Sequence, residues 1–193
     1  MLVEIIVKYR GGVGLIFFMS SIFNPGEILD KIKVEPEMVT ADFGCGSGYF
    51  VIELAKRVGE RGRVFAIDVV PQALESVRSL AKMRGFFNIE TRWANLEKTS
   101  TLEENSCDLI IVSNLFFQVD KKYWDAIIEE IYKVLKVEGR VLVIDWDSKS
   151  VLGPPKENRV GSDFIKDLFS EKFKAGKKME ISDTHWALIF TKK

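Results

Sequence analysis

Two features twenty residues apart in the sequence could together bind a ligand. The segment Ala41–Phe50 reads Ala-Asp-Phe-Gly-Cys-Gly-Ser-Gly-Tyr-Phe, so Asp42 stands two residues before the first of three alternating glycines. Asp68 follows the last of these glycines by twenty residues and closes an apolar run, Val64–Ile67. Glycines let a backbone approach a ligand closely, and a following helix offers free N–H groups at its start. The pattern predicts a strand, a glycine loop, a helix and a second strand that ends in a carboxylate.

The spacing of the glycines and the charge before them narrow the choice of ligand. A dinucleotide-binding loop reads Gly-x-Gly-x-x-Gly and holds pyrophosphate at the helix N-terminus. Here the third glycine comes one residue early, and Asp42 would repel a pyrophosphate while suiting the cationic amino group of a methionine moiety. Asp68 can accept hydrogen bonds from both hydroxyls of a ribose, although that feature does not separate S-adenosylmethionine (SAM) from NAD. Two simpler interpretations are a glycine turn without a ligand and Asp68 as the cap of a helix at Pro71.

Apolar runs and amphipathic segments predict the elements that position these residues. Helices are expected from an Asn24 cap and over 49–58, 71–84 and 121–135, and strands over 38–42, 63–68, 89–95, 107–114 and 139–146. Strands that alternate with helices indicate an α/β fold with a doubly wound, mostly parallel sheet, here of seven strands. Beyond residue 147 we expect a helix over 162–173 and two strands, 179–182 and 186–191, so close that they form a C-terminal antiparallel hairpin. The run Lys172–Lys178 is interpreted as a solvated loop.

Residues that end the later strands are further candidates, because ligands bind outside the carboxyl ends of parallel strands. Asn95, followed by Leu96, ends the third strand, where its amide or a backbone N–H could bind an adenine edge; the alternative is a polar loop residue. Asn114 ends the fourth strand and faces the same site. Phe116 and Phe117 after it could line the cleft or belong to the core.

Other residues could contact or activate a second substrate. Gln118, Trp146 and Asp147 are candidate substrate contacts, although Trp146 could instead cover the core. Asp145 and His185 are candidate general bases, but a single histidine beside Thr and Trp is more often structural. No Cys/His cluster has metal-ligand spacing, so no metal is expected. The formal net charge of zero gives no indication of nucleic-acid binding.

In this order and spacing, the motifs resemble those of class I SAM-dependent methyltransferases. The matching stretches are Ala41–Phe50, Ala66–Asp68, Asn95–Leu96, Ser113–Phe117 and Val134–Asp145. The last is similar to a Leu-Lys-Pro-Gly-Gly-Arg pattern in which Val137 and Glu138 replace Pro and Gly. The subgroup it most resembles is the compact small-molecule type of quinone biosynthesis and arsenite methylation. The resemblance implies methyl transfer from SAM to an unidentified small molecule by in-line displacement.

The resemblance also implies the residues of a cofactor site. Contacts to the methionine part fall to Asp42, Gly44, Gly46 and Gly48, those to ribose and adenine to Asp68 and Asn95, and Asn114 would lie beside the sulfonium; the neighbours Cys45, Val69 and Leu96 are placed in the same site. Ser113–Phe116 departs from the Asn-Pro-Pro-Tyr type, which disfavours methylation of DNA amino groups and protein glutamine. The alternatives are an NAD-binding oxidoreductase, a non-catalytic SAM-binding protein, and a protein or RNA methyltransferase.

The length of 193 residues predicts a single domain, 1–193, with an N-terminal arm, 1–23, that packs over the cleft or is poorly ordered. The arm's apolar run, Val13–Met19, is too short to span a membrane. Cys45 and Cys107 are expected at opposite ends of parallel strands and therefore as free thiols, which favours a reducing, cytoplasmic location. The sequence leaves open whether the protein forms homo-oligomers.

Overall fold

The computed structural model describes residues 4–9, 12–17 and 23–193. Near the N-terminus, β1 (Glu4–Tyr9) pairs with β2 (Gly12–Phe17) in an antiparallel ladder. Of the expected N-terminal arm, 1–23, residues 1–3, 10–11 and 18–22 lie outside the described residues, and the prediction that the arm packs over the cleft or is poorly ordered stays a prediction. The single-domain prediction is not tested by the fold and stays a prediction.

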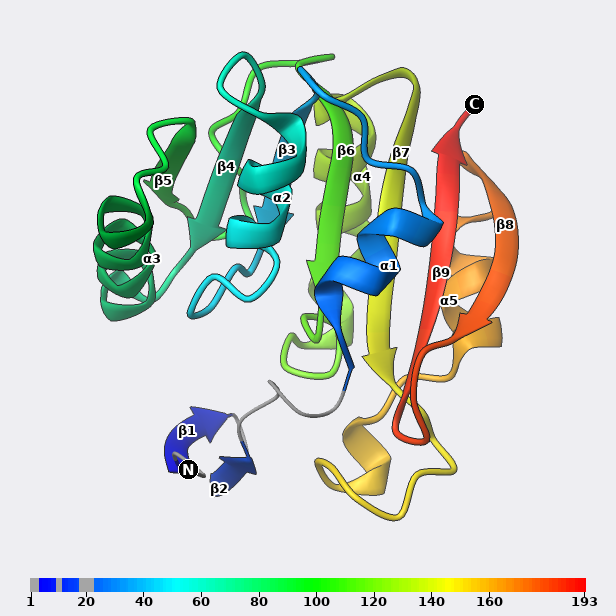
Figure 1. The fold of residues 1–193 in the computed structure, drawn as a ribbon. Coiled ribbons are helices and arrows are strands. Elements are labelled where there is room, and N and C mark those ends of the chain that lie inside the picture. The colour runs from blue at the N-terminus through cyan, green and yellow to red at the C-terminus, as the bar shows by residue number, and fades with distance from the viewer. Residues whose placement is uncertain (1–3, 10–11, 18–22) are drawn as a thin grey trace.

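Residues 39–192 build a seven-stranded sheet with the order β5-β4-β3-β6-β7-β9-β8 (Figure 1). Five strands are parallel: β3 (Val39–Phe43), β4 (Arg63–Asp68), β5 (Ile89–Trp93), β6 (Cys107–Ser113) and β7 (Leu135–Trp146). The last two, β8 (Phe173–Glu180) and β9 (His185–Lys192), pair antiparallel with each other, and β9 runs antiparallel to β7. The predicted fold class, a mostly parallel sheet with a C-terminal antiparallel hairpin, is confirmed.

Helices cover both faces of this sheet (Figure 1). One face packs against α1 (Pro25–Lys31), α2 (Val51–Val58) and α3 (Pro71–Arg84), and the other against α4 (Trp124–Val134) and α5 (Ser162–Phe169). Short 3₁₀ helices lie at Lys121–Tyr123 (η2) and Lys156–Asn158 (η3). Residues 109–112 of strand β6 are all apolar because their side chains alternate between the two cores: Leu109 joins one and Ile110 the other.

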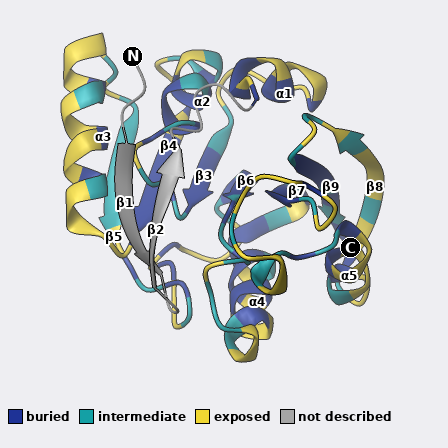
Figure 2. Ribbon diagram, turned by 90° about the horizontal axis from the view of Figure 1, so that it is seen from below, coloured by how far each residue is buried: buried dark blue, intermediate teal, exposed yellow. Residues whose placement is uncertain are grey.

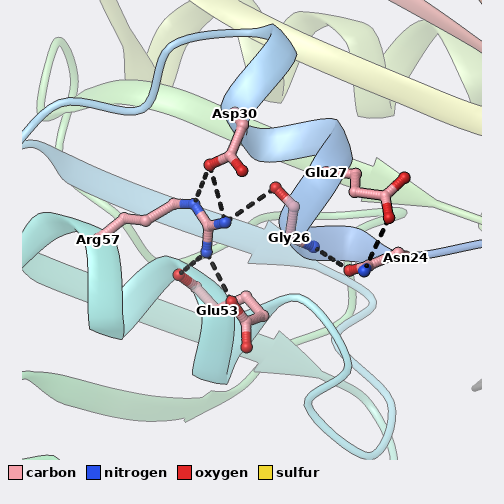
Figure 3. A network of polar contacts seen from close by, with 6 residues as sticks. All are labelled: Asn24, Gly26, Glu27, Asp30, Glu53 and Arg57. Carbon is pink, nitrogen blue, oxygen red and sulfur yellow. Dashed lines mark hydrogen bonds and ion pairs between the residues drawn. The ribbon is translucent and has the colours of Figure 1, made fainter.

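Helix α1 begins with the cap that the sequence predicts. The Asn24 side chain accepts a hydrogen bond from the Gly26 N–H at 2.8 Å, and its amide donates to Glu27 Oε1 at 3.2 Å (Figure 3). Pro25 occupies the first helical position, where its missing N–H costs nothing. These contacts fix the point at which the chain enters the part of the fold that contains the seven-stranded sheet.

Arg57 of α2 then holds α1 in place (Figure 3). Its guanidinium donates to Asp30 Oδ1 at 2.9 Å, to the Gly26 carbonyl at 2.8 Å and to Glu53 Oε2 at 2.6 Å. A planar fork of donors suits three acceptors on two helices in a way that a lysine could not. Because α2 follows directly from the glycine loop, this contact ties α1 to the loop's helix.

The C-terminal region corrects two predictions. The helix expected over 162–173 ends at Phe169. The prediction of a loop at Lys172–Lys178 is wrong, because most of this run lies in strand β8. The register shifts between Ala175 and Lys178, so a bulge breaks the alternation that would have marked a strand. Strand β8 is the edge of the sheet, where lysines discourage pairing with another chain.

Candidate functional site

The site lies where the chain reverses its winding direction. Strands β3, β4 and β5 follow one another outward on one side of the sheet, and β6 and β7 on the other, so β3 and β6 are neighbours at the switch. Ligands of open α/β sheets bind in the crevice outside the carboxyl ends at such a point. Figure 2 views this edge, at which the parallel strands end. The glycine loop after β3 and the residues that end β4, β5, β6 and β7 therefore meet there.

The glycine loop is fastened to the end of β4. The N–H groups of Gly44 and Cys45 both donate to the Ile67 carbonyl, at 2.8 and 2.9 Å, and the Gly48 N–H donates to the Cys45 carbonyl at 2.9 Å. Gly44, Gly46 and Gly48 have φ of 78°, 50° and 87°, in the left-handed region that favours glycine. The alternating glycines are thus required by the turn itself.

Only one of these glycines borders empty space. A Cβ on Gly44 would meet Leu115 Cδ1 at 3.1 Å, and one on Gly48 would meet Val77 Cγ2 at 3.0 Å, whereas one on Gly46 would meet no atom within 4 Å. The backbone at Gly46 is therefore the point at which a ligand can approach the loop closely.

Asp68 holds the loop as well as facing the site. Its Oδ2 accepts from the Gly46 N–H and its Oδ1 from the Val70 N–H, both at 2.9 Å. Helix α3 begins after Val70 without a side-chain cap, so the alternative interpretation of Asp68 as a helix cap does not hold. Each carboxylate oxygen has a second lone pair that a ribose hydroxyl could use.

Asp42 is a buried carboxylate that the described residues do not satisfy. The residue is 2% exposed, and no donor in the described part of the chain forms a hydrogen bond with its side chain. Burial raises its pKa to about 8, and the nearby charge of Asp68 adds to the rise. A cationic group placed beside Asp42 would supply the missing partner and lower this pKa. These residues therefore fit the ammonium and ribose of SAM.

The two cysteines are both buried and free, as the sequence predicts. Burial raises the pKa of the Cys45 thiol, and the charges of Asp42 and Asp68 raise it further. Burial also raises the pKa of the Cys107 thiol, to about 11. Neither is a thiolate at neutral pH, so Cys45 contributes backbone to the loop and no nucleophile.

An exposed apolar surface lies beside Asp68. Val69 and Val70 are about half exposed, and Trp93, which is 61% exposed, donates its indole N–H to the Val69 carbonyl at 2.8 Å. A flat base could cover this surface. Val70 and Trp93 were not among the predicted site residues. Val70 could have been added because it is an apolar residue just after Asp68, and Trp93 because it ends the neighbouring strand, where it pairs with Asp68.

Asn95 and Leu96 follow the end of β5 and help to build a turn. The Asn95 carbonyl oxygen Oδ1 accepts from the Glu97 N–H at 2.9 Å, which makes a turn, and Leu96 is buried. The carboxamide oxygen is thus engaged by the protein, and any adenine contact from Asn95 falls to its NH₂ group or to the backbone.

Asn114, at the end of β6, stands in an unusual backbone conformation. Its φ is 56°, a region that asparagine tolerates better than most residues, and its N–H donates to the Ile144 carbonyl at 2.8 Å. Its Oδ1 lies 3.1 Å from His185 Nε2, and its own carbonyl accepts from Gln118 Nε2 at 2.5 Å. Asn114 is therefore fixed from several sides.

His185 begins β9 and is 1% exposed. Its Nδ1 lies 2.8 Å from Thr184 Oγ1, and its ring centroid is 4.1 Å from that of Trp146 and 5.2 Å from that of Phe23. Burial lowers its pKa to about 4, so the ring is neutral at pH 7. Both ring nitrogens already have partners, which argues against a role as general base.

Asp145, the other candidate base, is fully buried beneath the loop that follows β6. Its carboxylate accepts from the N–H groups of Trp146 at 2.7 Å and Phe117 at 3.3 Å. Burial raises its pKa to about 7, and these bonds limit the rise. Phe116 lies in the core at 1% exposure. Asp145 therefore anchors the loop.

The three predicted substrate residues, Trp146, Asp147 and Gln118, have different surroundings. Trp146, 8% exposed, lies against His185. Asp147 accepts from the Lys149 N–H at 2.8 Å and lies 3.9 Å from Lys178 Nζ, toward β8. Gln118 also lines a hollow of about 220 Å³ between the loop after β6 and η3. Leu115 and Phe23 were not among the predicted site residues. Leu115 lies beside Gly44 and Phe23 beside His185, and these contacts join residues that are far apart in the sequence.

Two further properties concern the described residues alone. None of their His, Cys, Asp and Glu side chains gather in a group of three or more that could hold a metal ion. Among them there is also no helix that combines the length and the apolar character needed to cross a membrane.

Comparison with known proteins places this geometry in context. The family model described as "Methyltransferase domain" matches residues 34–188. The ubiquinone/menaquinone biosynthesis C-methyltransferase UbiE of Hydrogenovibrio crunogenus is 32% identical over 114 residues, which are 58% of this chain and 44% of that protein. EEF1A lysine methyltransferase 2 of Homo sapiens is 26% identical over 180 residues, 85% of this chain and 70% of that protein. The chain spans about half the length of the curated quinone relatives that it matches.

A solved structure supports the fold. The crystal structure of a SAM-dependent methyltransferase from Aquifex aeolicus superimposes with a TM-score of 0.83 at 23% sequence identity. The match covers 91% of this chain and 93% of that one, so the two chains share most of this fold.

Proposed function

Because this chain belongs to the methyltransferase domain family and is a SAM-dependent methyltransferase, we propose that it methylates a small-molecule acceptor at the carboxyl edge of its sheet. The observation that carries the site is Asp42: a buried carboxylate to which none of the described residues donates a hydrogen bond, beside a glycine loop with open space at Gly46. Family membership decides against the oxidoreductase alternative and against a non-catalytic role.

The proposed cofactor contacts divide between three elements. Asp42 binds the ammonium group of SAM, and the backbone of Gly44–Gly48 lies along the methionine part. Asp68 accepts the ribose hydroxyls while it keeps its bonds to the loop. The adenine lies over Val69, near Asn95 and Leu96. Asn114 stands at the reacting end, between the cofactor and the acceptor.

When bound, SAM supplies a methyl group on a sulfonium, an already activated leaving group. The protein's task is to hold the nucleophilic atom and the methyl group in line, about 3 Å apart, and to exclude water. Both ring nitrogens of His185 have partners, and the Asp145 carboxylate is fully buried with each oxygen accepting a backbone N–H, so neither residue is well placed to act as a base. We therefore propose an acceptor that needs no dedicated protein base.

A small molecule is favoured as the acceptor. The quinone relative acts in the biosynthesis of small molecules, and the net charge of zero offers no general attraction for nucleic acid. The lysine methyltransferase relative aligns over more of the chain, which makes a protein acceptor the second candidate. The two buried free thiols suit a reducing compartment, and we propose a cytoplasmic location.

The test has two parts. Calorimetry with SAM, S-adenosylhomocysteine and NAD should detect binding of the first two alone. The enzyme is then incubated with methyl-labelled SAM and a cell extract divided into low-mass and macromolecular fractions. Label transferred to the low-mass fraction supports the proposal, and label confined to protein or RNA contradicts it.

A further inference from the structure

A chain of hydrogen-bonded side chains leads to the acceptor end of the site, and the donor and acceptor in each of its bonds can be inferred. It runs from Ser182 through Thr184 and His185 to Asn114. Ser182 Oγ accepts from the backbone N–H groups of Thr184 at 3.2 Å and His185 at 3.1 Å, which leaves its own O–H to donate. It lies 3.0 Å from Thr184 Oγ1, which in turn lies 2.8 Å from His185 Nδ1. The Thr184 hydroxyl therefore donates to Nδ1, and the proton of the neutral ring stands on Nε2.

This chain ends on Asn114 and fixes the orientation of its carboxamide. A His185 Nε2–H can only be accepted by the amide oxygen, and Nε2 lies 3.1 Å from Asn114 Oδ1. The backbone carbonyl of Asn114 is likewise engaged by Gln118 Nε2 at 2.5 Å. The two oxygen acceptors that Asn114 could offer to an N–H of a substrate are thus already bonded.

The other acceptor nearby is also engaged. The Asp145 carboxylate receives the backbone N–H groups of Phe117 and Trp146 and lies at 0% exposure. An amine or amide nucleophile would find here only oxygens that already accept a hydrogen bond, so its N–H groups would have to share them, and an N–H left without a partner in a buried site is costly.

One donor has no partner. The indole Nε1 of Trp146 is buried, and no acceptor in the described part of the chain lies within hydrogen-bonding distance of it. Trp146 is 8% exposed and packs against His185, the residue that holds Asn114. Buried N–H groups are nearly always bonded, so a native group without a partner is one that a water molecule or a bound ligand could satisfy.

From this polarity we infer that the acceptor substrate is bound through an oxygen atom that accepts a hydrogen bond from the Trp146 indole: a phenolate, enolate, carboxylate or carbonyl oxygen, and not an amine or amide nitrogen. The inference rests on the proposed function, since it names the class of molecule that the same site would methylate. His185 acts in it as a positioning residue that keeps the Asn114 oxygen occupied.

A matched pair of probes tests the inference. S-Adenosylhomocysteine is titrated first, and the saturated enzyme is then titrated with 4-nitrophenol, above the pKa of its hydroxyl, and with 4-nitroaniline. We expect 4-nitrophenolate to bind at least about tenfold more tightly, since a hydrogen bond to a charged group exceeds a neutral one. Trp146→Phe should remove most of this preference. His185→Phe, which removes the ring N–H that the Asn114 oxygen accepts, should strengthen binding of 4-nitroaniline, whereas His185→Gln, which keeps an N–H donor, should not.

The outcomes separate the two proposals. Failure of S-adenosylhomocysteine to bind overturns the proposed function. If S-adenosylhomocysteine binds normally, three results would overturn the present inference alone. These are that 4-nitroaniline binds as tightly as 4-nitrophenolate, that neither probe binds, or that Trp146→Phe keeps the preference. Circular dichroism of each variant establishes that it is folded.

Discussion

The two halves of the carboxyl edge use their polar groups in opposite ways. In the half proposed to bind the cofactor, called the cofactor half, the Asp42 side chain has no donor among the described residues and Gly46 faces open space. In the acceptor half, Asn114, Asp145 and His185 are all bonded within the protein. The first half thus leaves polar groups available to a ligand, whereas in the second most polar groups form hydrogen bonds that hold the protein's own side chains and loops in place. Substitutions in the first should therefore change binding, and substitutions in the second should change stability and selectivity.

The largest effect is expected at the glycine loop. Gly46→Val would place a side chain in the open space that a ligand needs, so binding of S-adenosylhomocysteine should fall below detection by calorimetry. Gly85→Val is the matched control, because Gly85 also has a left-handed backbone with no atom within 4 Å of an added Cβ, but it ends α3. Both variants should lose similar stability in thermal melts. Retained binding by Gly46→Val would remove the loop from the site.

The next effect is expected at Asp68. Asp68→Ala removes hydrogen bonds to a charged group and should weaken S-adenosylhomocysteine binding by about 2–3 kcal/mol, measured by calorimetry. Part of this loss comes through the loop, because the Gly46 N–H loses its acceptor. Asp68→Asn keeps one oxygen acceptor and should lose less. Equal affinity of wild type and Asp68→Ala would contradict the ribose role.

The acceptor half should respond in stability instead. Thr184→Val removes the O–H that donates to His185 Nδ1 and leaves a buried nitrogen without a partner, which should cost about 1–3 kcal/mol in the free energy of unfolding. Thr184→Ser keeps the hydroxyl and should lose much less. Chemical denaturation measures both. The affinity of Thr184→Val for S-adenosylhomocysteine should stay close to that of wild type. A large loss of this affinity would contradict the distinction between the two halves.

This distinction also explains what the sequence alone could predict. The cofactor half comes from one local unit, β3 to β4, whose glycines and acids stand within 27 positions, 42–68, and their spacing carries the information. The parallel strands were predicted for the same reason, since apolar runs and helix ends are local. The strand at Lys172–Lys178 was missed because its bulge removes the alternation of side chains.

The acceptor half could not be assembled from the sequence in the same way. Asn114 and His185 are 71 positions apart, and Phe117 and Asp145 are 28 apart, so no short motif records their contacts. Each residue could be named as a candidate from its position at a strand end. Whether its polar atoms face a substrate or another side chain is decided by the packing of β6, β7 and β9.

The most direct test of the central claim is the pH dependence of S-adenosylhomocysteine binding. The Asp42 pKa of about 8 means that the carboxyl is mostly protonated in the free protein at neutral pH, and a ligand ammonium requires it ionised. Affinity should therefore rise as pH increases, by about twentyfold between about pH 6 and 7.5, a range below the pKa of an ordinary α-amino group.

Asp42→Asn is the control, because Asp145, with a pKa of about 7, also titrates in this range and is unchanged in the variant. Calorimetry across the range should give a steep rise for wild type, with release of a proton on binding, and a weak, nearly flat affinity for Asp42→Asn. A wild-type affinity that does not change with pH, or the same rise in the variant, would contradict the assignment of Asp42 as the ammonium-binding residue.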